Sequence, residues 1–358
     1  MATKLNNNHL SIILENCKKY KILDIYISLA YVSLETKDGQ YVIQTYSGNL
    51  ADLIEIVRIN VHCSYKTAYN CLTELINLNI LSYSSDLCGW TMLGMESMVK
   101  SKLDFPEDNS LYGYTTIRNF FITDEFYNMK AREKRLIIYL CQLSDSKKSN
   151  FYSDFSVNLL KPNSSWLKIL KTKSVYYART TLENLLKKYE NLFLDKSDDF
   201  RSKQFAPKRV NKFKFLFSSD LLKNNTDDLF NILKKNNTKE YNLIIDKIKF
   251  SGITLPKQKI MHLIRGIVGI RYWFIKERVV QIIINKYIAI QIHNSREDIK
   301  SLPAYVAAVV KSIINEFKIF EKNHKQYSKS RIVMEYQNQD INEDNYKQSV
   351  LKLISQFN

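Results

Sequence analysis

Glycine and proline are scarce in this sequence, with 8 glycines and 5 prolines among 358 residues. Few glycines leave few positions where the backbone can closely approach a phosphate group, and few prolines exclude long rigid linkers. The 5 cysteines are odd in number and form no C-x-x-C pair, which disfavours a disulfide framework and favours a reduced cytoplasm. We therefore expect a mostly helical chain with short connections.

Long apolar stretches are also missing. Residues 1–8 contain no apolar core of a secretory signal. Apolar runs such as 279–284 are broken by Gln281 and stopped by Asn285 and Lys286, far short of the roughly 20 residues that span a membrane. The sequence predicts a soluble cytoplasmic protein without a membrane partner.

Motifs of several enzyme classes are absent. Rolling-circle initiators and relaxases hold a metal with two histidines around one apolar residue, and no such pair occurs among the five scattered histidines. The sequence has no G-x-x-x-x-G-K-[ST] phosphate-binding loop and no zinc pattern of Cys and His. We therefore expect no catalytic residue, no metal site and no cofactor, and interpret Tyr176 and Tyr177 as part of a helix.

One fragment leaves an enzymatic alternative open. His262 and Arg265 form the H-x-x-R pattern of tyrosine recombinases, in which both residues activate the scissile phosphate. An upstream arginine box and a correctly spaced tyrosine are not evident. We prefer the interpretation that Arg265, Arg271 and Arg278 are solvated or DNA-facing residues on ordinary helices.

Positive charge is abundant. The net charge is +17, from 53 Lys+Arg against 36 Asp+Glu, and such an excess repels itself unless a polyanion lies near. An AT-rich genome also raises the pI through heavy use of Lys, Asn, Ile and Tyr. That bias does not explain the segment 201–214, which has six basic residues and no acidic one. The local run therefore indicates nucleic acid more strongly than the total charge does.

Polar stretches near residues 104–109 and 224–226 divide the sequence. We expect a mainly α fold with small β-hairpins, of the α+β class. The expected parts are a winged-helix domain over 8–103, a second over 112–220, a helical domain over 225–322, and a tail over 323–358, mobile apart from a short helix near 346–357.

The first two parts share one plan, in which two helices precede a β-hairpin. In the first part we expect helices over 49–56 and 64–78 and strands over 80–83 and 89–93. In the second we expect helices over 130–143 and 166–170, a helix opened by Ser174, and strands over 192–194 and 213–217. Both parts are typical of winged helix-turn-helix domains.

The segment 161–214 carries the strongest expected contacts with double-stranded DNA. In a helix-turn-helix the start of the second helix reaches base edges, and arginine offers two parallel donors to guanine. The expected contacts of this helix are Lys171, Thr172, Lys173, Ser174, Tyr176, Tyr177, Arg179 and Thr180. Those of the basic wing are Arg201, Lys203, Lys208, Arg209, Lys212 and Lys214.

The first winged part offers a secondary DNA site. Its expected contacts are Ser64, Tyr65, Lys66, Thr67 and Asn70. The stretch 52–80 is slightly acidic, so use of this part for dimerisation or core packing is an equal alternative.

The segment 120–140, an apolar start followed by a helix with basic and apolar faces, is similar to the opening of winged domains in plasmid replication initiator proteins of low-GC Gram-positive bacteria. The segment 299–311 resembles the closing helix of helical domains in primosomal and initiator proteins. The resemblance spans about two-thirds of the chain. It implies sequence-specific binding to origin repeats, as a homodimer or an array, and recruitment of host replication proteins. The slightly acidic first part departs from this pattern, and a transcriptional regulator or partition protein remains the alternative.

Overall fold

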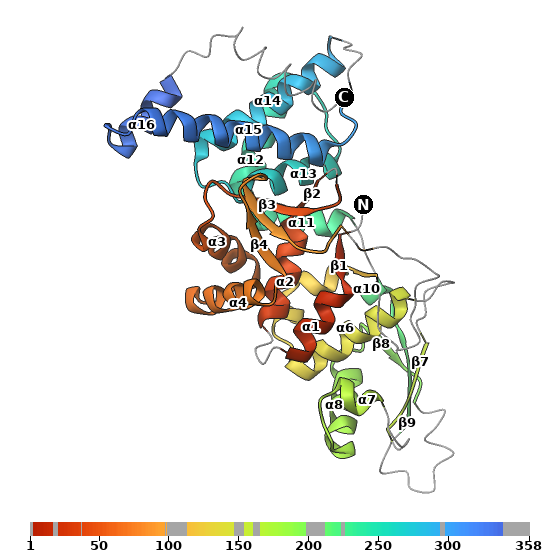
Figure 1. The fold of residues 1–358 in the computed structure, drawn as a ribbon. Helices are drawn as coiled ribbons and strands as arrows, with labels where there is room; N and C mark the ends of the chain where they lie inside the picture. Colours follow the sequence, from red (N-terminus) through yellow and green to blue (C-terminus); the bar gives the residue numbers. More distant parts are fainter. Residues whose placement is uncertain are drawn as a thin grey trace, which may run out of the picture. The chain divides into compact units, whose positions relative to one another are not determined.

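The structure, a computed structural model, describes residues 3–16, 21–36, 38–96, 98, 113–146, 154–159, 165–197, 212–222, 226–293 and 298–338. This part of the chain is mostly helical with small sheets (Figure 1). The expected fold class, mainly α with small β elements, is confirmed at this level. The chain divides into two compact units, made of residues 1–31, 57–81 and 92–232 and of residues 32–56, 82–91 and 233–358.

The first unit contains helices of both expected winged parts. Its elements, in chain order, are β1 (Lys4–Asn6), α1 (Asn7–Asn16), α2 (Lys21–Val32), α4 (Tyr65–Asn77), β6 (Tyr114–Thr116), the 3-10 helix η1 (Asn119–Ile122), α5 (Asp124–Tyr127), α6 (Ala131–Ser146), β7 (Asp154–Asn158), α7 (Ser165–Ile169), α8 (Val175–Lys188), β8 (Phe193–Asp195), β9 (Lys212–Phe217), α10 (Ser219–Leu222) and most of α11 (Thr226–Asn236).

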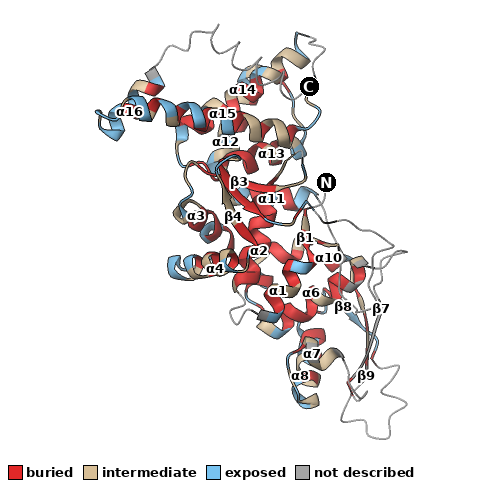
Figure 2. Ribbon diagram, viewed as in Figure 1, coloured by how far each residue is buried: buried red, intermediate tan, exposed pale blue. Residues whose placement is uncertain are grey.

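Helices α2 and α6 supply much of the buried interior of this unit, as the red ribbon in Figure 2 shows. Ile25 and Ala30 of α2 and Ile137 and Leu140 of α6 have no exposed surface. Strand β1 pairs antiparallel with β6, with Leu5 opposite Thr115. Removing such side chains from water is the main favourable contribution to folding.

The start of α6 differs from its expected basic face. Lys134 and Arg135 are buried rather than solvated. The Lys134 ammonium donates to both carboxylate oxygens of Asp24, at 2.6 and 2.7 Å, and to the backbone carbonyl of Tyr127 at 3.0 Å. Arg135 donates to the carbonyl of Leu14. These cations satisfy buried acceptors, so they are not available to DNA.

The first unit also contains a three-stranded sheet, in which β7 precedes α7 in the chain and β8 and β9 follow α8. Strand β9 pairs antiparallel with β7, where Phe155 lies opposite Phe215, and with β8, where Leu194 lies opposite Leu216. Phe213, Phe215 and Phe217 are buried, because alternate side chains of a strand point to the same face. The expected pairing of β8 with β9 is confirmed, and β7 is a further strand that the sequence did not predict.

The second unit combines a sheet with the C-terminal helices. Its sheet has the order β2-β3-β5-β4, and its elements are β2 (Leu34–Glu35), β3 (Tyr41–Gln44), most of β4 (Leu81–Ser84), β5 (Gly89–Met92), α12 (Thr238–Ser251), α13 (Lys257–Ile267), α14 (Trp273–Gln291), α15 (Leu302–Asn323) and α16 (Lys329–Asn338). Helix α3 (Leu50–Val61) runs from this unit into the first.

Close helix packing fixes the interior of the second unit. A Cβ atom placed on Gly266 of α13 would lie 2.2 Å from a side-chain carbon of Val306 in α15, so only glycine fits at this crossing. The Gln44 amide of β3 donates to the carbonyl of Ala307 in α15 at 2.7 Å. These contacts join the small sheet to helices more than 200 residues further along the chain.

Helix α16 corrects the expected mobile tail over 323–358, because residues 329–338 are helical. Its residues Ile332 and Tyr336 are buried, and the Tyr336 ring packs 4.9 Å from that of Phe317, measured between centroids. Lys329 of the same helix lies 5.9 Å from the centre of the Tyr272 ring. The amphipathic helix expected near 346–357 lies outside the described residues.

The predicted divisions between parts stay predictions. Residues 103–112 lie wholly outside the described part of the chain, as do residues 223–225. In the described part, the boundaries between the two compact units fall inside α2, α3, β4, β5 and α11 rather than in loops.

Candidate nucleic-acid interface

Helix α8 has a well-formed start. The Ser174 hydroxyl accepts from the Tyr177 backbone N–H at 3.4 Å, and the Thr172 hydroxyl accepts from the Ser174 N–H at 3.1 Å. A serine cap of this kind satisfies one of the donors that a helix leaves unpaired at its N-terminus. The four buried positions of the helix share one face: Ala178, Leu182, Leu185 and Leu186. That face holds the helix, and the opposite face meets solvent.

The solvent face carries the side chains expected to reach DNA. Tyr176 is 63% exposed and Tyr177 57% exposed, and their rings meet edge to face with centroids 5.6 Å apart. Arg179 and Thr180 are half-buried on the same helix. The Thr180 hydroxyl donates to the Tyr176 carbonyl at 3.0 Å, so its methyl group is the part left for an apolar contact.

Arg132 of α6 adds a cation that the sequence did not single out. Its guanidinium carbon lies 5.8 Å from the centre of the Tyr177 ring, within the range of a cation–π interaction. Arg132 is exposed, unlike Lys134 and Arg135 that follow it. The basic residues of the segment 130–135 were the only sign of this cation in the sequence. The tertiary structure shows that, among them, Arg132 lies beside α8.

The turn before α8 places two of the expected lysines differently. Lys171 has a φ of +46°, a left-handed conformation that is uncommon for a residue with a side chain. Its ammonium donates to the backbone carbonyl of Glu15 at 2.6 Å. Lys173 is exposed. The Lys173 side chain is therefore open to solvent, whereas the Lys171 ammonium is engaged by the Glu15 carbonyl.

Within the expected basic wing, residues 201–214, the structure describes only residues 212–214, at the start of β9. Arg201, Lys203, Lys208 and Arg209 lie outside the described residues, as does the side chain of Lys212. Lys214 lies on β9 with its side chain half-buried. Its backbone N–H donates to the Ser197 hydroxyl at 3.2 Å and its carbonyl accepts from the Lys196 N–H at 2.7 Å.

Helix α4 begins in the same way as α8. The Ser64 hydroxyl accepts from the Thr67 N–H at 3.2 Å, and Tyr65, Lys66 and Tyr69 are exposed. Thr67 and Asn70 are half-buried. In the turn before this helix His62 has a φ of +50°, matching Lys171 before α8. Both expected recognition helices thus follow a left-handed turn residue, open on a serine cap, and expose tyrosines on their first turns.

The H-x-x-R fragment lies on α13 in the second unit. Arg265 is only 8% exposed, and burial lowers the pKa of His262 to about 4, with a smaller contribution from the charge of Arg265. Arg278 donates to Glu316 at 2.9 Å and to the Tyr336 hydroxyl. Of the three arginines interpreted as solvated or DNA-facing, only Arg271 is exposed, and the interpretation is wrong for the largely buried Arg265 and Arg278.

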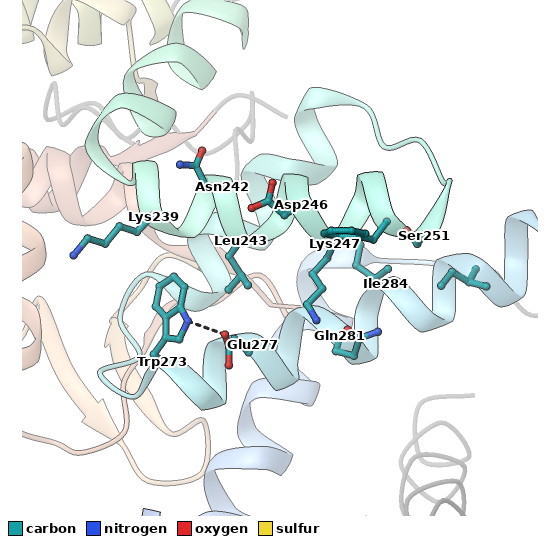
Figure 3. Close-up of a pocket in the computed structure, with 12 residues that line it drawn as sticks. Lys239, Asn242, Leu243, Asp246, Lys247, Ser251, Trp273, Glu277, Gln281 and Ile284 are labelled. Carbon is teal, nitrogen blue, oxygen red and sulfur yellow. Dashed lines mark hydrogen bonds between the residues drawn. The ribbon is translucent and has the colours of Figure 1, made fainter. Parts of the chain in front are cut away.

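A groove between α12 and α14 is a further hollow of the second unit, with a volume of about 910 Å³ (Figure 3). Its polar lining includes two cations and two anions, Lys239, Lys247, Asp246 and Glu277. This balance gives it no particular attraction for a polyanion.

In the part of the chain that the structure describes, no group of three or more His, Cys, Asp or Glu side chains is placed to hold a metal ion. No described helix combines the length and apolar character needed to cross a membrane. Comparisons of the chain with known protein families, with curated proteins and with solved structures found no match.

Proposed function

We propose that this chain is a sequence-specific, double-stranded DNA-binding protein that initiates replication of a plasmid or mobile element. In this proposal α7, α8 and the β8–β9 hairpin act as a winged helix-turn-helix, and the start of α4 is a secondary DNA contact. The protein binds origin repeats and recruits host replication proteins.

One observation carries the proposal: α8 is capped, anchored by one apolar face, and exposes Tyr176 and Tyr177 on its first turn, with Arg132 beside Tyr177 and Arg179 half-buried on the same helix. Outward aromatic and arginine side chains at the start of a helix suit entry into the major groove. The net charge of +17 supplies the attraction to phosphates that binding to any DNA needs.

Selection of binding sites from random duplexes with the purified protein tests the first half of this proposal. We expect enrichment of one motif, with the protein binding the motif more tightly than a shuffled duplex at the same salt concentration. Equal retention of all duplexes would rule out sequence-specific binding.

The replication role has a separate test. A plasmid that lacks its own initiator, given this gene and its flanking DNA, should be maintained, and a frameshift in the gene should abolish maintenance. Motif binding without maintenance, together with changed expression from a promoter beside the gene, would favour the alternative of a transcriptional regulator.

A further inference from the structure

A second hollow of the second unit, with a volume of about 490 Å³, lies where α15 ends and α16 begins (Figure 1). Its lining holds more positive than negative charge. Besides Tyr327 and Ile332, the described lining residues are four lysines and one acid: Lys318, Lys322, Lys325, Lys329 and Glu321. Among the residues that the structure describes, none of these four lysines forms an ion pair.

Aromatic side chains of the same unit fix the floor of this hollow. The Tyr46 hydroxyl donates to the Glu321 carboxylate, so the one acid of the lining is already engaged. The Lys318 ammonium lies 5.6 Å from the centre of the Tyr46 ring, and the Lys329 ammonium 5.9 Å from that of Tyr272. These two rings meet edge to face with centroids 4.8 Å apart. The hollow therefore keeps an excess of positive charge at positions that packed rings hold.

The positive charge continues along α15 beyond the hollow. Lys311, Lys318, Lys322 and Lys325 follow one another at intervals of seven, four and three residues, which places them on one stripe of the helix. Both Lys311 and Lys318 lie close enough to the Cys88 thiol to oppose the rise in its pKa that burial causes. We call these four lysines and Lys329 the lysine ridge.

The length of the lysine ridge selects among anions. From Lys311 to Lys325 the helix rises about 21 Å, at roughly 1.5 Å per residue. One strand of duplex DNA carries a phosphate about every 3.4 Å along the axis, so about six phosphates can lie beside this stripe. A small anion would meet only the ammonium groups around the hollow. A line of like charges is thus matched best by a polymer of phosphates.

The exposed side chains of the hollow favour nucleic acid over a membrane surface. Lys322, Lys325 and Lys329 are exposed, whereas Tyr327 is half-buried and Ile332 is buried. Binding to a bilayer needs apolar side chains that enter it, and this lining offers none that is exposed. Lysines act as point charges toward phosphates and carry no base information.

We propose that the lysine ridge binds the phosphate backbone of duplex DNA independently of base sequence. The ridge is a second DNA contact, on the unit that does not contain α8. This goes beyond the proposed function, whose DNA contacts lie in the first unit, and it does not require that α8 recognise a motif.

Fluorescence anisotropy of the full chain with a duplex of arbitrary sequence, over a range of salt concentrations, tests the ridge. The variant carries Lys311→Gln, Lys322→Gln and Lys325→Gln, all at exposed positions. We expect its slope of log K against log salt concentration to be shallower by up to about 2.7, at about 0.9 per lost contact, and its binding to be roughly tenfold weaker at low salt. The charge-matched control changes Lys235, Lys239 and Lys249, exposed on α11 and α12, to Gln and should keep the parental slope.

A variant of opposite sign guards against loss of folding. Glu321→Gln keeps an acceptor for the Tyr46 hydroxyl and removes the negative charge of the hollow. It should therefore tighten binding to the same duplex by roughly two- to fivefold, a gain that a misfolded protein would not show. Circular dichroism of each variant checks the helical content.

Four results would overturn the assignment: no binding of the duplex by the parent, an unchanged slope in the triple lysine variant, an equal change in the control, or weaker binding by Glu321→Gln. Vesicles containing phosphatidylserine form a further arm, and binding to them that depends on the ridge while duplex binding does not would assign the ridge to membranes instead. Failure to select a motif would leave this result standing. Motif recognition that is lost in Arg179→Ala, together with an unchanged slope in the triple variant, would remove the ridge alone.

Discussion

Arg179 is the residue through which we expect α8 to recognise a base. A guanidinium donates two parallel hydrogen bonds to guanine, and its loss leaves those acceptors unpaired. Arg179→Ala should weaken binding to the selected motif by roughly 1–3 kcal/mol and leave binding to a shuffled duplex nearly unchanged. Fluorescence anisotropy at fixed salt measures both. Lys187→Ala, in the last turn of the same helix, is the control and should affect both duplexes equally.

The buried pair of Asp24 and Lys134 gives a second prediction at this scale. Burial raises the pKa of Asp24 and lowers that of Lys134, and the attraction between the two groups only partly opposes these shifts. Asp24→Leu should therefore reduce the free energy of unfolding by about 3–5 kcal/mol, because it strands the Lys134 charge. Combining it with Lys134→Met should recover most of that loss in urea denaturation. If the double variant were as unstable as Asp24→Leu alone, apolar side chains could not replace this ion pair.

His9 links stability to pH in the first unit. Burial lowers its pKa to about 4, and its ring nitrogen lies 3.2 Å from the Tyr26 hydroxyl. Between about pH 4 and 6.5 the unfolded chain binds a proton at this histidine and the folded chain does not, so acid favours unfolding. Above about pH 6.5 the free energy of unfolding carries no loss from His9. As the pH falls toward 4, protonation of the unfolded chain at His9 lowers the free energy of unfolding by on the order of 3 kcal/mol.

Urea denaturation of the parent and of His9→Gln between pH 4.5 and 7.5 measures this effect. The variant should lose the part of the pH dependence that belongs to His9, whereas His293→Gln, at an exposed position, should keep the parental slope. Parallel slopes for the parent and His9→Gln would contradict the assignment.

The starts of helices α4 and α8 are the structural features that the sequence predicted best. The apolar spacing and the serine before each helix predicted α4 and α8, because both signals are local. Strands β2, β3 and β7 escaped prediction, since they are short and β3 is buried on both faces without any alternation. The contacts of Arg132 with Tyr177 and of Lys171 with Glu15 also escaped, because they join residues far apart in the sequence.

The contribution of the Ser174 cap to the stability of α8 can be measured. Ser174→Ala removes the acceptor of the Tyr177 N–H and should cost about 1 kcal/mol of stability, concentrated in the first turn of the helix. Amide hydrogen exchange should accelerate at the start of α8. Ser174→Asp, which restores an acceptor and suits the helix dipole, should return exchange to the parental rate or below it. Unchanged exchange in Ser174→Ala would show that tertiary packing alone holds this turn.

Charge acts at the scale of the whole molecule. Each phosphate contact that a cation makes steepens the fall of log K with log salt concentration by about 0.9. Changing Lys208 and Arg209 of the predicted wing to Gln should therefore reduce the slope by up to about 1.8 and weaken binding to all sequences alike. The exposed pair Lys234 and Lys235, changed in the same way, is the charge-matched control. Equal slopes for the two variants would place the wing away from DNA.

The interleaving of the two compact units determines when each can fold during synthesis. Residues 32–56 and 82–91 leave the ribosome early, but the helices that cover their sheet begin after residue 233. Gln44 meets Ala307 only when nearly the whole chain has emerged. Contacts of such long sequence separation form slowly and leave apolar strands uncovered in the meantime. A nascent chain stalled before residue 233 is therefore expected to depend on chaperones, whereas the completed chain closes its own sheet.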